Sequence, residues 1–298
     1  IYTCYVTDDK RVLIGVVTVK DMLLAGEDAL IGDIMDTKPI YVYTDDDKDD
    51  VMKAMTKYDF LAMPVVDKET RLVGIVTIDD AMDVLQDEDT EDIELMAAIT
   101  PSDKPYLKTG VFETWRSRII WLMLLMVSAT FTSRILTHFE DALASLPILV
   151  AFVPQLMDTG GNAGGQASVS VIRALSLGDI QMKDFMRVLW KEFRVALLCG
   201  LTLAVVNFVK MMIFNDVSRS VYGVSMSLII SAVVCVTIAL AVVIAKVIGS
   251  MLPILAKRIG FDPAVMASPL ITTIVDVVSL LVYFLISTTV LSHAGLAL

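Results

Sequence analysis

The chain has 298 residues, of which 56% are hydrophobic, and its mean hydropathy is strongly positive. Several apolar runs exceed the roughly 18 residues that indicate a membrane-spanning helix, which excludes an ordinary soluble domain. Residues 1–100 carry 24 of the 35 acidic and 9 of the 24 basic side chains, so an acidic soluble module that should repel nucleic acid and attract cations precedes a weakly basic membrane module.

The first hundred residues contain a repeated unit. The segment R-V-L-I-G-V-V-T-V-K-D-M-L at 11–23 recurs as R-L-V-G-I-V-T-I-D-D-A-M-D at 71–83. Each copy predicts a β-branched strand, then Thr-x-x-Asp, then the start of a helix, and such tandem units share one core. Residues 1–6 already read as a strand in progress, so we expect the natural N-terminus to lie further upstream.

This pattern resembles the CBS domain, a βαββα module that works in pairs and often binds adenine nucleotides. The second copy looks complete and the first retains only its last strands and helix. Asp21 and Asp80, each three residues after a threonine, admit two interpretations. They could hydrogen-bond a ribose while helix N-terminal amides face a phosphate, or they could simply be first-turn helix residues.

Acidic residues cluster at 45–50 and again at 79–94. Asp80, Asp83 and Asp87 fall on one helical face, where like charges repel unless a cation lies among them. Hard oxygen ligands would suit Mg²⁺ or Ca²⁺. The alternative is a solvated acidic face without a bound ion.

Five apolar spans follow, at about 119–137, 145–170, 194–214, 224–250 and 265–290. Nine basic residues flank them on the side of the N-terminal module and three on the other side. The positive-inside rule therefore predicts a cytoplasmic N-terminal module and a C-terminus outside. In the second span, Asp158, Asn162 and Gln166 form one polar stripe beside four glycines. The glycines favour close helix packing or close approach of an ion, and the stripe favours contact with water over lipid.

The fifth span carries Asp276 at its centre, with Thr272, Thr273 and Ser279 near the same face. A carboxylate there costs about 2.5–3.5 kcal/mol on insertion scales and normally marks an ion path. An ion pair with Lys246 of the fourth span is the alternative. Because dehydrating Mg²⁺ is costly and each chain offers one such carboxylate, a homodimer with two copies of Asp276 around a hydrated ion is attractive.

The whole chain resembles the MgtE-type magnesium channels, through the paired CBS units, the acidic connecting helix, T-G-G-N-A-G at 159–164 and D-P-A-V-M-A-S-P-L-I-T-T-I-V-D at 262–276. We therefore expect an α+β CBS module followed by an all-α membrane domain of five helices. The expected divisions are the end of the first CBS repeat at 1–30, the second repeat at 31–86, a plug-like helix at 87–114 and the pore domain at 115–298.

The resemblance implies a non-enzymatic Mg²⁺ channel or transporter of the cell membrane, with its pore at a homodimer interface in the lipid bilayer. It implies Asp276 and Asn162 as pore residues, and we expect Thr272, Thr273 and Ser268 to line the pore with them. It implies closure by cytosolic Mg²⁺ bound at Asp47, Asp49, Asp59, Asp80, Asp83, Asp87, Glu88 and Glu91. ATP, as a regulatory ligand, would bind near Lys20, Asp21, Phe60 and Asp83.

Two positions depart from the pattern: Gly165 and Ser268 stand where some members carry asparagine, so selectivity could differ in detail. The alternative function is CBS-regulated transport of another divalent cation, Mn²⁺ or Co²⁺. Chloride transport would favour basic or amide-lined sites. Potassium transport would need a T-V-G-Y-G filter and an intramembrane protease would need His-Glu-x-x-His, and the sequence contains neither motif. A sensor that only signals would not need Asp276.

Overall fold

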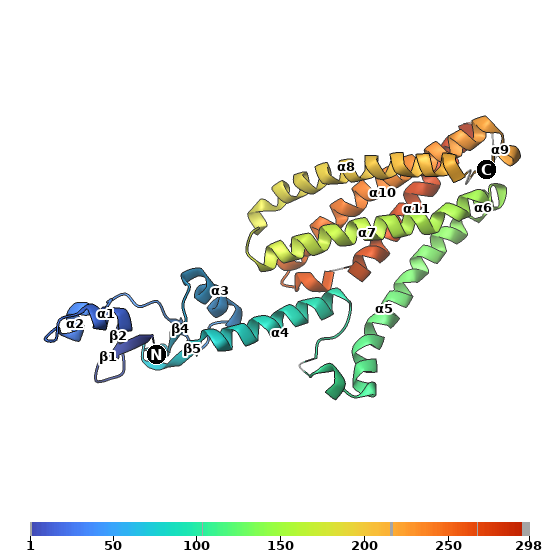
Figure 1. The fold of residues 1–298 in the computed structure, drawn as a ribbon. Coiled ribbons are helices and arrows are strands. Elements are labelled where there is room, and N and C mark those ends of the chain that lie inside the picture. Colours follow the sequence, from blue (N-terminus) through green and yellow to red (C-terminus); the bar gives the residue numbers. More distant parts are fainter. Residues whose placement is uncertain (1, 103, 215–216, 267, 294–298) are drawn as a thin grey trace. The chain divides into compact units, whose positions relative to one another are not determined.

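The computed structural model describes residues 2–102, 104–214, 217–266 and 268–293. Its contacts divide the chain into two compact units, residues 1–91 and 92–298, and each is described by itself. Figure 1 shows the order of the helices and strands along the chain.

The first unit opens with a hairpin in which β1 (Thr3–Thr7) pairs antiparallel with β2 (Leu13–Thr18). Two short helices follow, α1 (Val19–Leu24) and α2 (Ile31–Ile34). The β2 residues Leu13 and Val17 are buried while Ile14 is exposed, which is the alternation expected of a strand with one buried face.

The second part of this unit contains β3 (Val42–Tyr43), α3 (Lys48–Tyr58), β4 (Ala62–Val66), β5 (Leu72–Thr77) and α4 (Ile78–Met96). The sheet order is β3-β4-β5, with β3 parallel and β5 antiparallel to β4. Its small core consists of Val42, Val51, Met55, Met63 and Ala81.

The repeat predicted from the sequence has a structural counterpart in the two hairpins. Strand β1 pairs with β2 from Thr3–Thr18 to Thr7–Leu13, and β4 pairs with β5 from Ala62–Thr77 to Val66–Leu72. Both turns use one residue with positive φ, Arg11 at 64° and Thr70 at 60°. Equivalent sequence therefore adopts equivalent local structure, down to the turn.

The second unit is helical. After η1 (Tyr106–Lys108) come α5 (Val111–His138), α6 (Glu140–Ser145), α7 (Ile148–Ser176), η2 (Met182–Asp184), α8 (Phe185–Phe214), α9 (Arg219–Tyr222), α10 (Val224–Arg258), η3 (Pro263–Met266) and α11 (Ser268–His293). Helix α10 packs against α7, α8 and α11, and α11 also packs against α7 and α5.

Four helical stretches of the described residues are long and apolar enough to cross a membrane: Val111–His138, Met182–Phe214, Val224–Arg258 and Pro263–Val290. Helix α7, the second span predicted from the sequence, is a continuous helix of 29 residues but is not among the four. Its proline, its polar stripe and its glycines reduce its apolar character. The helices also run past the predicted spans, since a helix continues into polar residues beyond the hydrocarbon layer.

Candidate functional site

The glycines of α7 let this helix approach α11 closely. A Cβ on Gly160 would lie 3.0 Å from both Ser279 Oγ and Val275 Cγ1, and one on Gly161 would lie 2.9 Å from Thr272 Cγ2. A Cβ on Gly249 of α10 would collide with the backbone of Gly164. Of the two interpretations of the glycine run, close helix packing is the one that the structure displays.

Asp276 lies on α11 between Thr272 and Ser279, two of the residues that the glycines of α7 approach. The carboxylate is partly buried, and its Oδ1 and the buried Oγ of Ser279 have no hydrogen-bond partner among the described residues. No ion pair joins Asp276 to Lys246 within the described part of the chain. A buried acceptor without a protein partner is costly, so this site is suited to a cation or to the water shell of one.

Thr273 faces another neighbour. Its Oγ1 donates to the backbone oxygen of Pro269 at 3.1 Å and accepts from Ser128 Oγ of α5 at 3.4 Å. The threonine thus joins α5 to α11, and its place in a pore remains a prediction. The side chain of Ser268 lies outside the described residues.

Asn162 lies on the exposed stripe of α7 predicted from the sequence. Its Nδ2 donates to Asp158 Oδ1 at 3.0 Å, and Gln166 is exposed one turn further along. The described residues contain no hydrogen bond between Asn162 and Asp276. Asn162 instead lines an open cavity of about 830 Å³ together with Gly165, Gln166, Val169 and Ser170 of α7, Glu192 and Val195 of α8, and Lys246 of α10.

Sequence analysis missed Glu192 as part of this cavity. The sequence signal was an acidic residue in the first turns of a helix whose neighbouring charged residues, Arg187, Lys191 and Arg194, are basic. Only the packing of α8 and α7 on α10 brings it to the same cavity as Lys246.

The end of α4 packs on the membrane helices within the second unit. Leu95 and Met96 contact Ile172 of α7 and Ala264 of η3, both of which are buried. The backbone N–H of Thr100 also donates to the backbone oxygen of Ser117 in α5 at 2.9 Å. The connecting helix is therefore fixed beside the segment that leads into α11.

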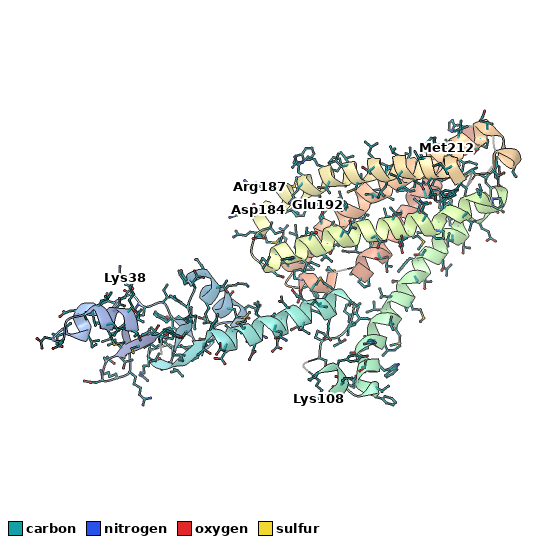
Figure 2. The ribbon with its side chains drawn as sticks, viewed as in Figure 1. Lys38, Lys108, Asp184, Arg187, Glu192 and Met212 are labelled. Carbon is teal, nitrogen blue, oxygen red and sulfur yellow. The ribbon has the colours of Figure 1, made fainter. Side chains whose placement is uncertain are left out.

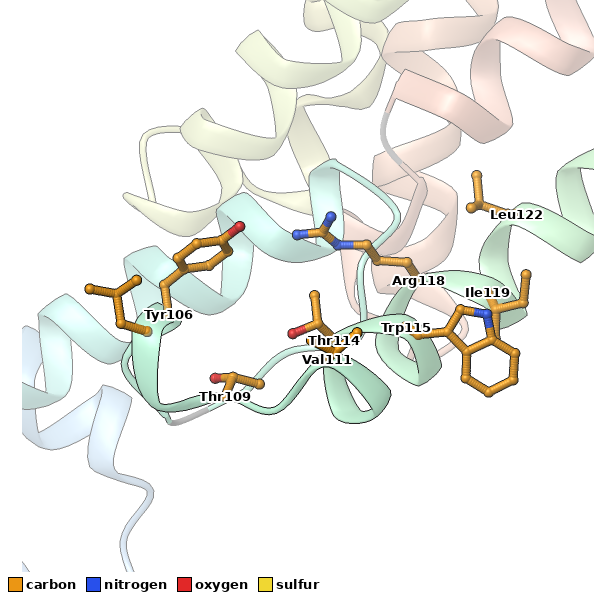
Figure 3. A pocket seen from close by; sticks show the side chains of 9 residues that line it. Tyr106, Thr109, Val111, Thr114, Trp115, Arg118, Ile119 and Leu122 are labelled. Carbon is orange, nitrogen blue, oxygen red and sulfur yellow. The ribbon is translucent and has the colours of Figure 1, made fainter.

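A second cavity of about 500 Å³ lies where the chain enters α5 (Figure 3). Its lining includes Tyr106, Trp115 and Arg118, with apolar side chains between them. Aromatic and basic residues at a helix end, such as Trp115 and Arg118 here, are typical of a membrane boundary.

In the first unit, carboxylates converge where α3 begins beside α4. Asp47 caps α3, its Oδ1 accepting from Asp49 N–H at 2.9 Å, and Glu88 of α4 pairs with Lys48 at 2.8 Å. The Oδ1 of Asp49 is buried without a hydrogen-bond partner among the described residues. Burial, and then the charges of Glu88 and Asp47, raise the pKa of Asp49, while Glu88 raises the pKa of Lys48.

The other predicted regulatory residues lie apart from this cluster or on its solvent side. Asp59 ends α3 in a left-handed conformation with φ 54°, and Asp83, Asp87 and Glu91 are exposed on α4. Within the described residues, no group of three or more carboxylate, histidine or cysteine side chains is close enough together to hold a metal ion. These carboxylates could attract a cation, but the described residues do not form a complete coordination site.

The two Thr-x-x-Asp segments act as helix caps. Thr18 Oγ1 donates to Asp21 Oδ2 at 2.5 Å, and Thr77 Oγ1 donates to Asp80 Oδ2 at 2.6 Å. These hydrogen bonds lower the pKa of both carboxyl groups. Of the other residues expected near ATP, Phe60 stacks on Tyr58 at 5.6 Å and Lys20 follows the Thr18 cap. The hydrogen bonds observed are those of helix caps, and the role of Asp21 in nucleotide binding remains a prediction.

The second unit is a bundle of apolar helices with a mid-helix carboxylate that lacks a partner among the described residues, and an acidic α/β module precedes it. This arrangement is typical of a membrane protein with an attached α/β module. Residues 153–286 match the family model MgtE, described as a divalent cation transporter, and residues 31–87 match the CBS domain. The chain thus carries the MgtE-family membrane domain together with a CBS domain, and the resemblance seen in the sequence is confirmed.

Curated relatives extend this similarity over most of the chain. A protein named magnesium transporter MgtE from Thermus thermophilus is 42% identical over 95% of this chain and 60% of its own length. One of the same name from Enterococcus faecalis is 33% identical over the same shares. The chain therefore spans about 60% of the length of these relatives.

Two solved structures are similar to part of the chain. One described as the soluble part of a magnesium transporter is 44% identical, covers 30% of this chain and 34% of the other, and has a TM-score of 0.29. Another, a cytosolic domain of the Mg²⁺ channel MgtE in complex with ATP, is 48% identical, covers 28% and 34%, and has a TM-score of 0.28.

Proposed function

We propose that this protein conducts Mg²⁺ across the cell membrane and is not an enzyme. The observation that carries the proposal is Asp276, a carboxylate at mid-helix whose buried oxygen has no partner among the described residues. The match to a divalent cation transporter model and the names of the curated relatives support Mg²⁺ as the ion. Transport of Mn²⁺ or Co²⁺ is the alternative, because a single carboxylate does not discriminate strongly among hydrated divalent ions.

The pore would form between two copies of the chain. One Asp276 per chain gives half of a site for a hydrated ion, and a twofold axis supplies the other half. The exposed stripe of Asp158, Asn162 and Gln166 on α7 would add polar groups at a helix surface that cannot face hydrocarbon cheaply. Thr272, Thr273 and Ser268 would complete the lining near Asp276, and α7 would act as the second of five spans.

Cytosolic Mg²⁺ would close this pore through α4. The helix begins beside the carboxylates of α3 and ends on Ile172 and Ala264, next to α11. An ion that binds the closed arrangement more tightly must shift the equilibrium toward closure. The N-terminal module would then lie in the cytoplasm and the C-terminus outside, as the distribution of basic residues indicates.

ATP would act as a second regulatory ligand of the CBS module. Its recognition would use Lys20, Asp21, Phe60 and Asp83, with helix N-terminal amides available to a phosphate. In this arrangement the caps formed by Thr18 and Thr77 hold the two aspartates in place before a nucleotide arrives.

The test of the proposal is Mg²⁺ flux into proteoliposomes, read with an entrapped Mg²⁺-sensitive dye at equal protein loading. Asp276→Asn keeps the shape of the side chain and removes its charge, and we expect flux to fall at least tenfold. Asp141→Asn changes an exposed carboxylate of α6 and should leave flux unchanged. Equal flux in Asp276→Asn and the unmodified chain would remove the carboxylate from the ion path.

A further inference from the structure

The segment that leads into α5 exposes a cluster of large apolar side chains. This entry patch consists of Tyr106, Leu107, Val111, Phe112 and Trp115, and Leu107, Val111 and Phe112 are 94%, 86% and 84% exposed. Four of its five members line the cavity at the start of α5. The described residues of the second unit leave this patch uncovered. Apolar surface gathered in one place is costly in water, so it marks a surface that another molecule covers.

The position of the entry patch along the chain indicates that lipid covers it. Val111–His138 is one of the stretches long and apolar enough to cross a membrane, and the patch lies in its first turns and just before them. Two contacts fix the preceding segment to the helix. Lys104 Nζ pairs with Glu113 Oε1 at 2.7 Å, and Thr100 N–H donates to the backbone oxygen of Ser117 at 2.9 Å. The patch is therefore held where a spanning helix enters the headgroup layer.

The charges beside the patch indicate the sign of that lipid. Residues 104–118 contain the basic residues Lys104, Lys108, Arg116 and Arg118 and one acidic residue, Glu113, which Lys104 already pairs. Arg118 lines the cavity and has no ion pair among the described residues. The nine lining residues include no carboxylate. Charge complementarity therefore favours an anionic headgroup over a zwitterionic one.

The cavity has a polar end and an apolar end. In Figure 3 the guanidinium of Arg118 and the hydroxyl of Tyr106 point toward one another. Ile119 and Leu122 line the cavity further along α5, within its apolar stretch. The planar guanidinium presents several N–H donors that match phosphate oxygens, while an acyl chain needs an apolar wall. The volume of about 500 Å³ accommodates a headgroup and the start of one acyl chain.

We propose that this cavity binds an anionic phospholipid, as in phosphatidylglycerol, with its phosphate on Arg118 and one acyl chain along Ile119 and Leu122. The Tyr106 hydroxyl donates to the phosphate, and the entry patch lies in the headgroup layer around it. The site lies within one chain and shares no residue with the pore lining proposed above. Lipid binding can therefore be measured without reference to ion flux.

The experiment measures lipid binding to the full chain in detergent by native mass spectrometry, with short-chain phosphatidylglycerol and phosphatidylcholine of equal chain length as probes. The unmodified chain should bind phosphatidylglycerol at least tenfold more tightly. Arg118→Gln should abolish this preference and leave phosphatidylcholine binding within twofold. The matched control Arg116→Gln removes an exposed charge two residues away, outside the cavity, and should keep the preference. Leu107→Ser should weaken binding of both lipids at least threefold.

A second measurement does not depend on how Arg118→Gln folds. The chain has three tryptophans, so Trp121→Phe with Trp190→Phe leaves Trp115 as the single fluorophore. Brominated phosphatidylglycerol should quench Trp115 more strongly than brominated phosphatidylcholine at the same mole fraction in vesicles. Equal quenching by the two lipids would contradict the anionic preference.

Four further results would overturn the assignment. A folded Arg118→Gln with an unchanged thermal midpoint and an intact preference would remove the arginine from the site. An equal loss in Arg116→Gln would reduce the preference to general charge attraction. Inorganic phosphate that displaces phosphatidylglycerol at equal concentration would make this a free-anion site. Complete cross-linking between copies through Val111→Cys, with or without lipid, would mean that a second chain covers the patch.

Discussion

At the scale of single residues, the environment of a carboxylate decides what it does. Asp80 accepts hydrogen bonds from Thr77 and serves a helix cap, so its negative charge is stabilised locally. Asp49 is partly buried beside Glu88 and Asp47, so its negative charge is opposed. Asp276 is partly buried, and one of its oxygens lacks a hydrogen-bond partner in the part of the chain that the structure describes. Sequence alone sets Asp276 apart by its apolar span, whereas only packing separates the roles of Asp49 and Asp80.

Asp49→Asn tests the opposed charge. Because the folded pKa of Asp49 is raised above its ordinary value, folding favours the protonated form, and stability is lost as pH rises through the interval between the two values. At pH 7 the substitution should therefore raise the thermal midpoint of the full chain, by roughly 1–3 °C. The gain should shrink at pH values below the ordinary pKa of an aspartate, where the wild-type group is neutral as well.

The control for this measurement is Asp50→Asn, one residue along the same helix, at an exposed position. A midpoint that rises equally in both variants would show a general effect of lowering the acidity of α3. A midpoint that falls in Asp49→Asn would contradict the opposed-charge interpretation.

At the scale of elements, α7 combines two faces that sequence can identify but cannot orient. The polar stripe at i, i+4 and i+8 was predicted, and the structure places it on the exposed side. Gly160, Gly161 and Gly164 lie on the other side, against Ser279, Thr272 and Ile271. The sequence left open whether the glycines allow helix packing or the approach of an ion. The periodicity of one helix does not identify which other helix packs against it.

Gly249→Ala tests the closest of these approaches. Its Cβ would meet the backbone of Gly164, which cannot rotate away as a flexible side chain could, so α10 and α7 must separate. We expect a loss of about 1–3 kcal/mol in stability, read as a lower thermal midpoint in detergent. Gly110→Ala, whose Cβ meets nothing within 4 Å, should change the midpoint little. Equal midpoints for the two variants would mean that the helices adjust without cost.

At the scale of the whole molecule, the chain joins an acidic module to a helix bundle by one helix. The module, the apolar helices and the central carboxylate were predictable, because composition and period reveal them directly. The cavity between α7 and α8 and the Lys48–Glu88 pair were not, since both depend on side chains brought together by tertiary packing. The sequence also could not give the full length of α7, because its mixed composition obscures where the helix ends. In the structure α7 is one continuous helix.

The carboxylates beside α3 give a prediction at this scale. Neutralising Asp47, Asp49 and Glu88 together should leave conduction intact and raise the internal Mg²⁺ needed for closure by about tenfold, within the usual range of coupling between sites. Flux into proteoliposomes preloaded with increasing Mg²⁺ measures this shift. The matched control neutralises Glu27 and Asp28, exposed acids of the same module that lie away from α4. An unchanged Mg²⁺ dependence in the first variant would separate this cluster from gating.

The ion pair between Lys48 and Glu88 has a consequence for how a Mg²⁺ threshold could be set. A cation bound at this place must compete with an ammonium group that the chain itself supplies. Binding of Mg²⁺ would then replace the Lys48 ammonium at Glu88. The Mg²⁺ concentration at half-closure would depend on the difference between the affinities of the cluster for Mg²⁺ and for the ammonium group. A chain with arginine or glutamine at position 48 would have its threshold moved up or down while its conducting path stayed the same. Under the proposed function, the Lys48 ammonium would act as an internal competitor of Mg²⁺ at this cluster.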